Sequence, residues 1–112
     1  MVTNAQLPRM YRKYNRLYFS GKLPVNLEVA FETEGKNLRG WGVTDYICDS
    51  HGCYYPTKIL INRSLKVCRG WASMTLLHEM VHVELPYGAS HGPRFQARMR
   101  KLASQGAFDR WW

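Results

Sequence analysis

The chain has 112 residues, of which 46% are hydrophobic and 13% aromatic, so it holds enough apolar material for one compact domain but too little for two. It carries 16 Lys and Arg against 8 Asp and Glu, a formal net charge of +8. No stretch is long and apolar enough to span a bilayer, and the first 13 residues lack the apolar segment of a secretory signal. These features argue against a membrane or secreted protein, and we expect a single domain over residues 1–112 that is cytoplasmic or associated with the nucleoid.

The first predicted element is an amphipathic helix. Its apolar residues recur at helical spacing: Leu7, Met10, Tyr11, Tyr14, Leu17 and Tyr18. Pro8 must lie in the first turn, and Gly21 with Pro24 marks the exit from the helix. The opposite face is basic and comprises Arg9, Arg12, Lys13 and Arg16. Residues 1–24 contain no acidic side chain at all.

Three strands are predicted next. Between residues 25 and 31 apolar side chains alternate with polar or small ones, which is typical of a half-buried strand. Residues 41–46 and 58–61 are predicted to form two further strands, separated by a polar, Gly-containing loop over residues 49–55. The sequence therefore predicts a small three-stranded sheet.

The three cysteines, Cys48, Cys53 and Cys68, fit an intracellular protein, because a small secreted domain more often carries an even set paired in disulfides. We interpret them as free thiols in the loop and near the start of the next helix. An alternative is a second zinc site formed by these cysteines with His51, although the spacing is irregular for a zinc knuckle.

The next helix carries the most informative pattern, His78-Glu79-Met80-Val81-His82. Residues 71–85 contain no Gly or Pro and Pro86 follows, so we predict a helix that is apolar almost all round and enclosed by the domain. Two histidines four residues apart point to the same side of a helix and can bind one metal ion, with Glu79 beside it as a catalytic base. A single histidine on such a helix would more often be a hydrogen-bonded core residue, but the pair flanking a Glu favours ligation.

A third ligand is expected at His91. Structural zinc sites close their shell with four protein ligands, whereas catalytic sites use three and leave a position for water. The turn-rich residues 86–90 would fold the chain back toward His82, and Gly92 with Pro93 suits a sharp turn into a new helix. The alternative is that His91 is an exposed loop histidine.

The last predicted helix is amphipathic, with Phe95, Met99 and Leu102 on its apolar face. A second basic stripe lies on this helix and comprises Arg94, Arg98 and Lys101, with Arg100 beside it. Two basic faces on so small a domain favour contact with nucleic acid or another polyanion over a merely solvated surface. Trp111 and Trp112 could stack on unpaired bases or cap the core.

The motif residues resemble a known family. His78-Glu79-Met80-Val81-His82 followed by His91-Gly92-Pro93-Arg94-Phe95 is similar to the signature of the SprT-like (Spartan-type) zinc metalloproteases. Upstream, Phe19-Ser20-Gly21-Lys22-Leu23-Pro24 looks like the family's F-x-G-x-L-P exit from its opening helix, and residues 59–62 stand where a strand precedes the motif helix. The likeness spans residues 7–102. Unlike many members, the sequence has no CxxC pair after the protease core, and its loop from His82 to His91 is shorter than in typical members.

The resemblance implies a minimal zincin-like α+β metalloprotease domain with an N-terminal helix, a three-stranded sheet, the active-site helix and a C-terminal helix. It implies Zn²⁺ held by His78, His82 and His91, with Glu79 as the general base of an endopeptidase that acts on DNA-associated proteins. A carboxylate next to a zinc ion that lowers the pKa of water is consistent with that chemistry. Tyr87 or Arg94 could stabilise the oxyanion; alternatively Tyr87 packs in the turn and Arg94 faces solvent.

Two other functions remain open. A metal-dependent nuclease could use three histidines and a basic surface, but phosphodiester hydrolysis tends to use carboxylate-rich sites, and no acidic cluster is evident. A non-catalytic zinc-containing DNA-binding protein is the other alternative. In that protein, Glu79 would have no role in function.

Overall fold

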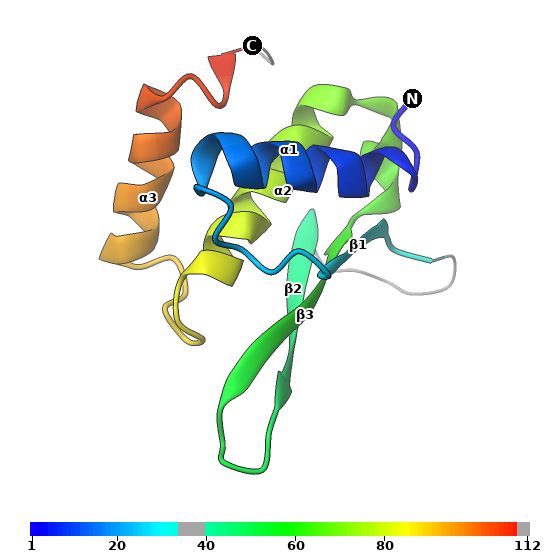
Figure 1. Cartoon of the computed structure of the whole chain (residues 1–112). Coiled ribbons are helices and arrows are strands. Elements are labelled where there is room, and N and C mark those ends of the chain that lie inside the picture. Colours follow the sequence, from blue (N-terminus) through cyan, green and yellow to red (C-terminus); the bar gives the residue numbers. More distant parts are fainter. Residues whose placement is uncertain (34–39, 110–112) are drawn as a thin grey trace.

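The computed structural model describes residues 1–33 and 40–109 and has an α+β architecture (Figure 1). Three α-helices, one 3-10 helix and three strands follow one another in the order α1 (Gln6–Tyr18), β1 (Glu28–Phe31), β2 (Gly42–Cys48), β3 (Tyr54–Ile61), η1 (Arg63–Val67), α2 (Arg69–Glu84) and α3 (Pro93–Ser104). The predicted sequence of one helix, three strands and two helices is confirmed, with η1 added. Within the described part of the chain, no helix has the length and apolar content needed to cross a bilayer.

The three strands form one mixed sheet in the order β1-β3-β2. β1 pairs in parallel with β3, from Glu28 opposite Lys58 to Phe31 opposite Ile61. β2 pairs antiparallel with β3, from Gly42 opposite Ile61 to Cys48 opposite Tyr54, with a register shift between Asp45 and Tyr46. β2 is therefore an edge strand. The hairpin of β2 and β3 extends well beyond the helices (Figure 1).

Three predicted strand boundaries differ by two residues or more. β2 continues to Cys48, two residues past its predicted end, and β3 begins at Tyr54, four residues before its predicted start, so the loop predicted over residues 49–55 is shorter at its second end. Backbone hydrogen bonds between β2 and β3 extend both strands into the segment that was predicted to be a loop. The first strand begins at Glu28 rather than at Val25, whose side chain is 78% exposed.

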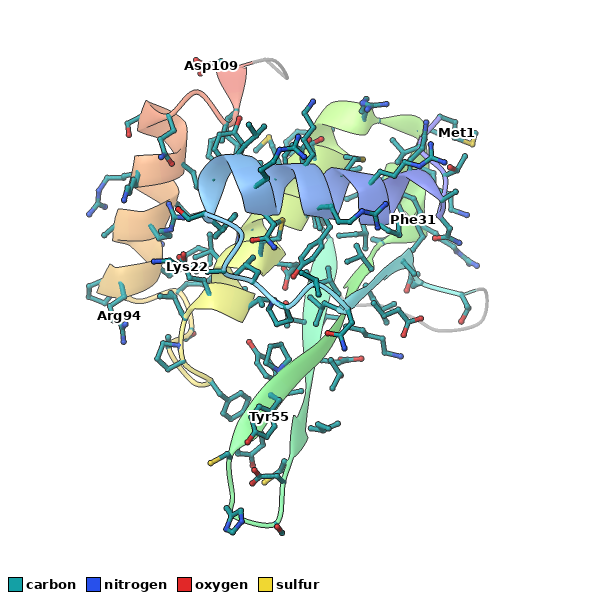
Figure 2. The ribbon with its side chains drawn as sticks, in the orientation of Figure 1. Met1, Lys22, Phe31, Tyr55, Arg94 and Asp109 are labelled. Atoms are coloured by element: carbon teal, nitrogen blue, oxygen red, sulfur yellow. The ribbon has the colours of Figure 1, made fainter. Side chains whose placement is uncertain are left out.

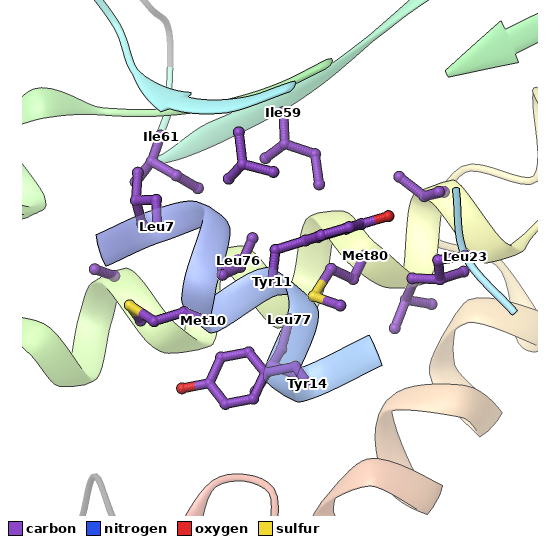
Figure 3. Packing of buried hydrophobic residues seen from close by; sticks show 14 of the residues in the cluster. Leu7, Met10, Tyr11, Tyr14, Leu23, Ile59, Ile61, Leu76, Leu77 and Met80 are labelled. Carbon is purple, nitrogen blue, oxygen red and sulfur yellow. The ribbon is translucent and has the colours of Figure 1, made fainter. Parts of the chain in front are cut away.

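Helices α1 and α2 pack against each other and both against the sheet, and the apolar side chains between them form the core (Figure 3). Leu7 and Tyr11 of α1 and Leu76 and Met80 of α2 are fully buried, as is Ile59 of β3. Close packing of such side chains provides most of the stability of a domain of this size.

One residue of the predicted apolar face of α1 does not join this core. Leu17 is 50% exposed, whereas the neighbouring Tyr18 is partly buried against the core. The prediction for Leu17 was therefore wrong, whereas Leu7, Met10, Tyr11 and Tyr14 are buried as predicted.

Hydrogen bonds fasten the segment after α1 back onto the helix. The Asn15 amide donates to the Leu23 carbonyl and accepts from the Leu23 N–H, both at 3.1 Å. The Tyr11 hydroxyl donates to the Pro24 carbonyl at 2.6 Å, and burial raises the pKa of Tyr11 to about 12. Gly21 has a φ of +69°, which favours glycine and confirms the predicted exit turn.

Candidate metal centre

Three histidines from two segments converge in the structure. His78 and His82 lie one turn apart on α2, and His91 lies in the loop before α3. The Nε2 atom of His91 is 3.1 Å from Nε2 of His78 and 3.1 Å from Nε2 of His82. Among residues 1–33 and 40–109 this is the one group of three or more His, Cys, Asp or Glu side chains whose ligand atoms gather closely enough to hold a metal ion.

The spacing of these nitrogens fits zinc. With Zn–N bonds of ~2.0–2.1 Å in a tetrahedral arrangement, ligand nitrogens lie roughly 3.3–3.4 Å apart. The observed 3.1 Å separations are close to that value. The residues present therefore fit a zinc ion with three protein ligands.

Phe95 of α3 forms the base beneath the three imidazoles. Its ring centroid lies 4.7 Å from those of His78 and His82 and 4.8 Å from that of His91. The side chain is almost fully buried. The sequence placed Phe95 on an apolar helix face and at the end of the run that begins at His91, but its contact with all three imidazoles is a finding of the structure.

Two of the imidazoles, those of His78 and His82, are held in their neutral form. Burial, followed by the proximity of His82 and His91, lowers the pKa of His78 to about 4. Burial and the proximity of His91 also lower the pKa of His82. Both rings therefore carry a free nitrogen lone pair at neutral pH, which is the form that binds metal.

Glu79 is buried next to the histidines, with only 5% of its surface exposed. Its Oε2 lies 3.9 Å from Nε2 of His78, and its Oε1 accepts a hydrogen bond of 2.9 Å from the Thr44 hydroxyl. Burial raises the pKa of Glu79 to about 7, and the bond from Thr44 partly opposes that rise. A carboxyl group with this pKa can take up and release a proton near neutral pH.

The sequence did not single out Thr44. It lies inside a predicted strand, and its role follows only from the packing of β2 against α2. The same packing explains Gly42: a Cβ atom there would lie 2.7 Å from Cγ2 of Thr75 and 3.2 Å from Cγ of Glu79. A glycine at the start of the strand was the available signal, but only the position of α2 explains why a glycine is needed there.

Two clefts open on the histidines, and both include Gly42, His78 and Glu79. The first has a volume of about 330 Å³ and is mostly apolar, with Trp41, Met74 and Met99 in its walls. The second has a volume of about 370 Å³ and also reaches residues of β2 and of the loop before His91; these include Thr44, Tyr46, Tyr87 and Ser90. Because the two clefts share Gly42, His78 and Glu79, they adjoin at the metal centre beside edge strand β2, and we refer to them together as the groove.

The two candidate oxyanion donors differ in position. Tyr87 is in the wall of the second cleft and stacks on Tyr54, with ring centroids 4.0 Å apart and planes inclined by 14°. Arg94 is exposed, contributes to neither cleft and projects from the start of α3 (Figure 2). The structure therefore favours the alternative for Arg94, a side chain facing solvent.

The possible second zinc site is not formed. Cys48 and Cys53 are exposed free thiols near the tip of the hairpin, and Cys68 is a half-buried free thiol just before α2. Their sulfur atoms and the imidazole of His51 do not gather into a ligand group within the described residues. The interpretation as free thiols agrees with the structure.

The basic face of α1 is exposed as predicted at Arg9, Arg12, Lys13 and Arg16. The predicted stripe on α3 needs a correction at Arg98. Its Nε donates to Glu84 at 2.6 Å, its Nη2 donates to the Tyr18 carbonyl at 2.5 Å, and its guanidinium lies 4.7 Å from the centre of the Phe19 ring. Arg98 therefore joins α3 to α1 and α2 instead of facing solvent. The predictions for Trp111 and Trp112 lie outside the described residues.

Comparison of the chain with protein-family models, with curated proteins and with solved structures found no match. Evidence for function therefore comes from the residues of the centre themselves.

Proposed function

We propose that the protein is a zinc-dependent endopeptidase of the SprT-like type. The observation that carries this proposal is the convergence of His78, His82 and His91 beside a buried glutamate, Glu79, at the floor of a groove. A purely structural zinc site would use four protein ligands, but the described residues supply three.

The donor set supports zinc. Three imidazoles without a thiolate or a ligating carboxylate suit Zn²⁺ better than Mg²⁺ or Ca²⁺, which prefer oxygen ligands. When bound, zinc would supply a Lewis acid that polarises a carbonyl group and lowers the pKa of water toward ~7.

Glu79 would act as the general base and then as the general acid. Oε1 is held by Thr44, and Oε2 lies on the side of His78. With a pKa of about 7, the carboxylate can accept a proton from the attacking water and pass it to the departing amine. The Thr44 hydroxyl fixes the orientation of the carboxylate during both transfers.

Edge strand β2 supports a protein substrate rather than a small molecule. An extended peptide could add to the edge of the sheet through main-chain hydrogen bonds, which require little of the peptide sequence. The clefts on either side of Gly42 would then receive side chains next to the peptide bond that is cut. A nuclease is less well supported, because the only carboxylate at this centre is Glu79 in the part of the chain that the structure describes.

The basic face of α1 supports an association with DNA. The Tyr14 hydroxyl is 2.7 Å from the Ser73 hydroxyl, so α1 packs on the side of α2 that includes Ser73. At about 100° per residue, His78 and His82 lie on the opposite side of α2. Phosphates bound by Arg9, Arg12, Lys13 and Arg16 would therefore leave the groove open, and nearby DNA-bound proteins would be the substrates.

The decisive experiment compares the wild type with Glu79→Gln on three substrates: casein, a DNA-binding protein and nucleic acid. We expect the zinc-loaded wild type to cleave the proteins but not the nucleic acid. Glu79→Gln should keep its zinc and lose about 10²- to 10⁴-fold in turnover, the usual contribution of a general base. Cleavage of nucleic acid by the wild type would indicate a nuclease, and full function in Glu79→Gln would indicate a non-catalytic binding protein.

DNA binding is tested separately by titration at increasing salt. The affinity for DNA of any sequence should fall as the salt concentration rises. Replacing Arg12 and Arg16 with Glu should make the slope of log affinity against log salt concentration shallower by about one for each phosphate that is no longer bound. The matched control replaces Arg94 and Arg100 on α3 with Glu, which gives the same change in net charge. Equal decreases in affinity in both double variants would mean that overall charge, and not the α1 face, attracts the DNA.

A further inference from the structure

Three tyrosines join the β2–β3 hairpin to the loop that carries His91, and the proposed chemistry uses none of them. Tyr46 belongs to β2, Tyr54 begins β3, and Tyr87 lies in the loop between α2 and His91. We call this group the tyrosine clasp. It is a second contact between the hairpin and the metal centre, besides the bond from Thr44 to Glu79.

The clasp is built from ring contacts and one hydrogen bond. Tyr87 stacks on Tyr54 at 4.0 Å and meets Tyr46 edge-on at 4.9 Å. The Tyr46 hydroxyl donates to the main-chain carbonyl of His82 at 3.1 Å. One end of the clasp is therefore fixed to α2 next to a metal ligand, and the other end holds the middle of the loop.

The loop needs such support because His91 is the least constrained of the three ligands. His78 and His82 are placed by the helix, whereas the His91 side chain is exposed. Gly88 and Ser90 both have positive φ angles, +88° and +53°, and the second is unfavourable for a residue with a side chain. The local bond from the Gly92 N–H to the Ala89 carbonyl is long, at 3.4 Å.

We propose that the tyrosine clasp is a positioning device that holds His91 within reach of the metal, so that the hairpin is part of the metal centre. This inference rests on the proposed zinc site. Tyr54 and Tyr87 are positioning residues, since they act through the loop and do not touch the ion. By linkage, zinc binding should in turn hold the hairpin against the loop.

The exposure of the clasp makes it testable without unfolding the protein. Tyr54 and Tyr87 are 47% and 56% exposed, so truncating either one leaves the core intact. The interaction energy of one such aromatic pair is enough to change the zinc-binding equilibrium by about 3- to 10-fold. The readout is the zinc affinity of the full chain, measured by competition with a chromophoric chelator.

We expect Tyr54→Ala and Tyr87→Ala to bind zinc about 3- to 10-fold more weakly, with an unchanged melting temperature of the metal-free protein. Tyr54→Phe and Tyr87→Phe should restore the affinity, because they keep the ring. Tyr55→Ala is the matched control: Tyr55 is the next residue of β3, is similarly exposed and donates its hydroxyl bond to Asp49 instead. Wild-type affinity in Tyr54→Ala, or an equal loss in Tyr55→Ala, would overturn the proposal.

A double-mutant cycle shows whether the clasp acts through His91. In a His91→Ala background, Tyr54→Ala should cause no further loss of zinc affinity, since the ligand it positions is gone. Amide hydrogen exchange of residues 47–55 should slow on zinc addition in the wild type and much less in Tyr54→Ala. Zinc binding that is unaffected by either clasp variant would disprove the clasp alone, whereas a wild type that binds no zinc would disprove the proposed function.

Discussion

The two sides of helix α2 have different roles although they belong to the same sixteen residues. The side toward α1 and the sheet contains Leu76, Leu77 and Met80, all fully buried. The opposite side presents His78 and His82, half-buried, to the groove. The buried core and the proposed zinc site thus lie on opposite sides of one helix, so changes on one side should spare the other.

The greatest loss of stability should come from a change on the buried side. Leu77→Ala should lower the free energy of unfolding by about 2–5 kcal/mol, because it removes a fully buried side chain and leaves a cavity. The folded fraction should still bind zinc. Urea unfolding in the presence of a chelator measures the loss, and metal analysis of the folded protein measures the zinc content.

His82→Ala is the matched change on the other side of α2. It should abolish stoichiometric zinc binding and leave the stability of the metal-free protein nearly unchanged. If His82→Ala destabilised the metal-free protein as much as Leu77→Ala, the separation between the two sides would be wrong.

Glu79 lies at the border between the two sides and should respond to pH. Its pKa is about 7 in the folded protein against 4.5 for an ordinary carboxyl, so the folded state binds more protons than the unfolded state between these values. The stability of the metal-free protein should therefore fall as pH rises from 4.5 to 7. Glu79→Gln removes the cost of keeping a charged carboxylate buried. The variant should therefore be more stable than the wild type by about 3 kcal/mol above roughly pH 8, with almost no difference at about pH 4.

Thermal or urea unfolding at about pH 4, 6 and 8, with zinc removed, tests this prediction. Glu28→Gln serves as the control, because Glu28 is exposed and its neutralisation should change stability by only a few tenths of a kcal/mol at any of these pH values. A stability difference for Glu79→Gln that stays constant with pH would contradict the assigned pKa.

A smaller effect is expected where β2 approaches α2. Gly42→Ala would place a methyl group 2.7 Å from Thr75 Cγ2, and Thr75 is a branched side chain with little freedom to move. The substitution should cost about 1–3 kcal/mol, as overpacking usually does, and should also disturb the adjacent Glu79. Unfolding measurements together with turnover on casein would show both effects, and an unchanged turnover would mean that Glu79 keeps its place.

Much of the structure could be predicted from local patterns. Helical periodicity identified α1 and α3, a run without Gly or Pro that ends before Pro86 identified α2, and the spacing of His78 and His82 placed both on one side of α2. His91 could be predicted because a three-ligand site required one more donor and a turn-rich segment preceded it. These inferences succeeded because each depends on residues close together in the sequence.

The contacts that escaped prediction depend on packing between distant segments. Thr44 bonds to Glu79 only because β2 lies along α2, and Phe95 meets all three imidazoles only because α3 returns to the same helix. Arg98 had the periodicity of a solvated stripe, yet Glu84 and the Tyr18 carbonyl draw it inward. No periodicity in a single segment contains that information.

The parallel pairing of β1 with β3 has a consequence for how the chain folds. Strands β2 and β3 are joined by a short turn and can pair within microseconds, whereas Glu28 must find Lys58 much farther along the chain. Closing that longer loop costs entropy before any contact offsets it. We expect refolding to be limited by the arrival of the N-terminal segment, and pulse-labelling exchange should show protected amides in residues 42–61 earlier than in residues 28–31.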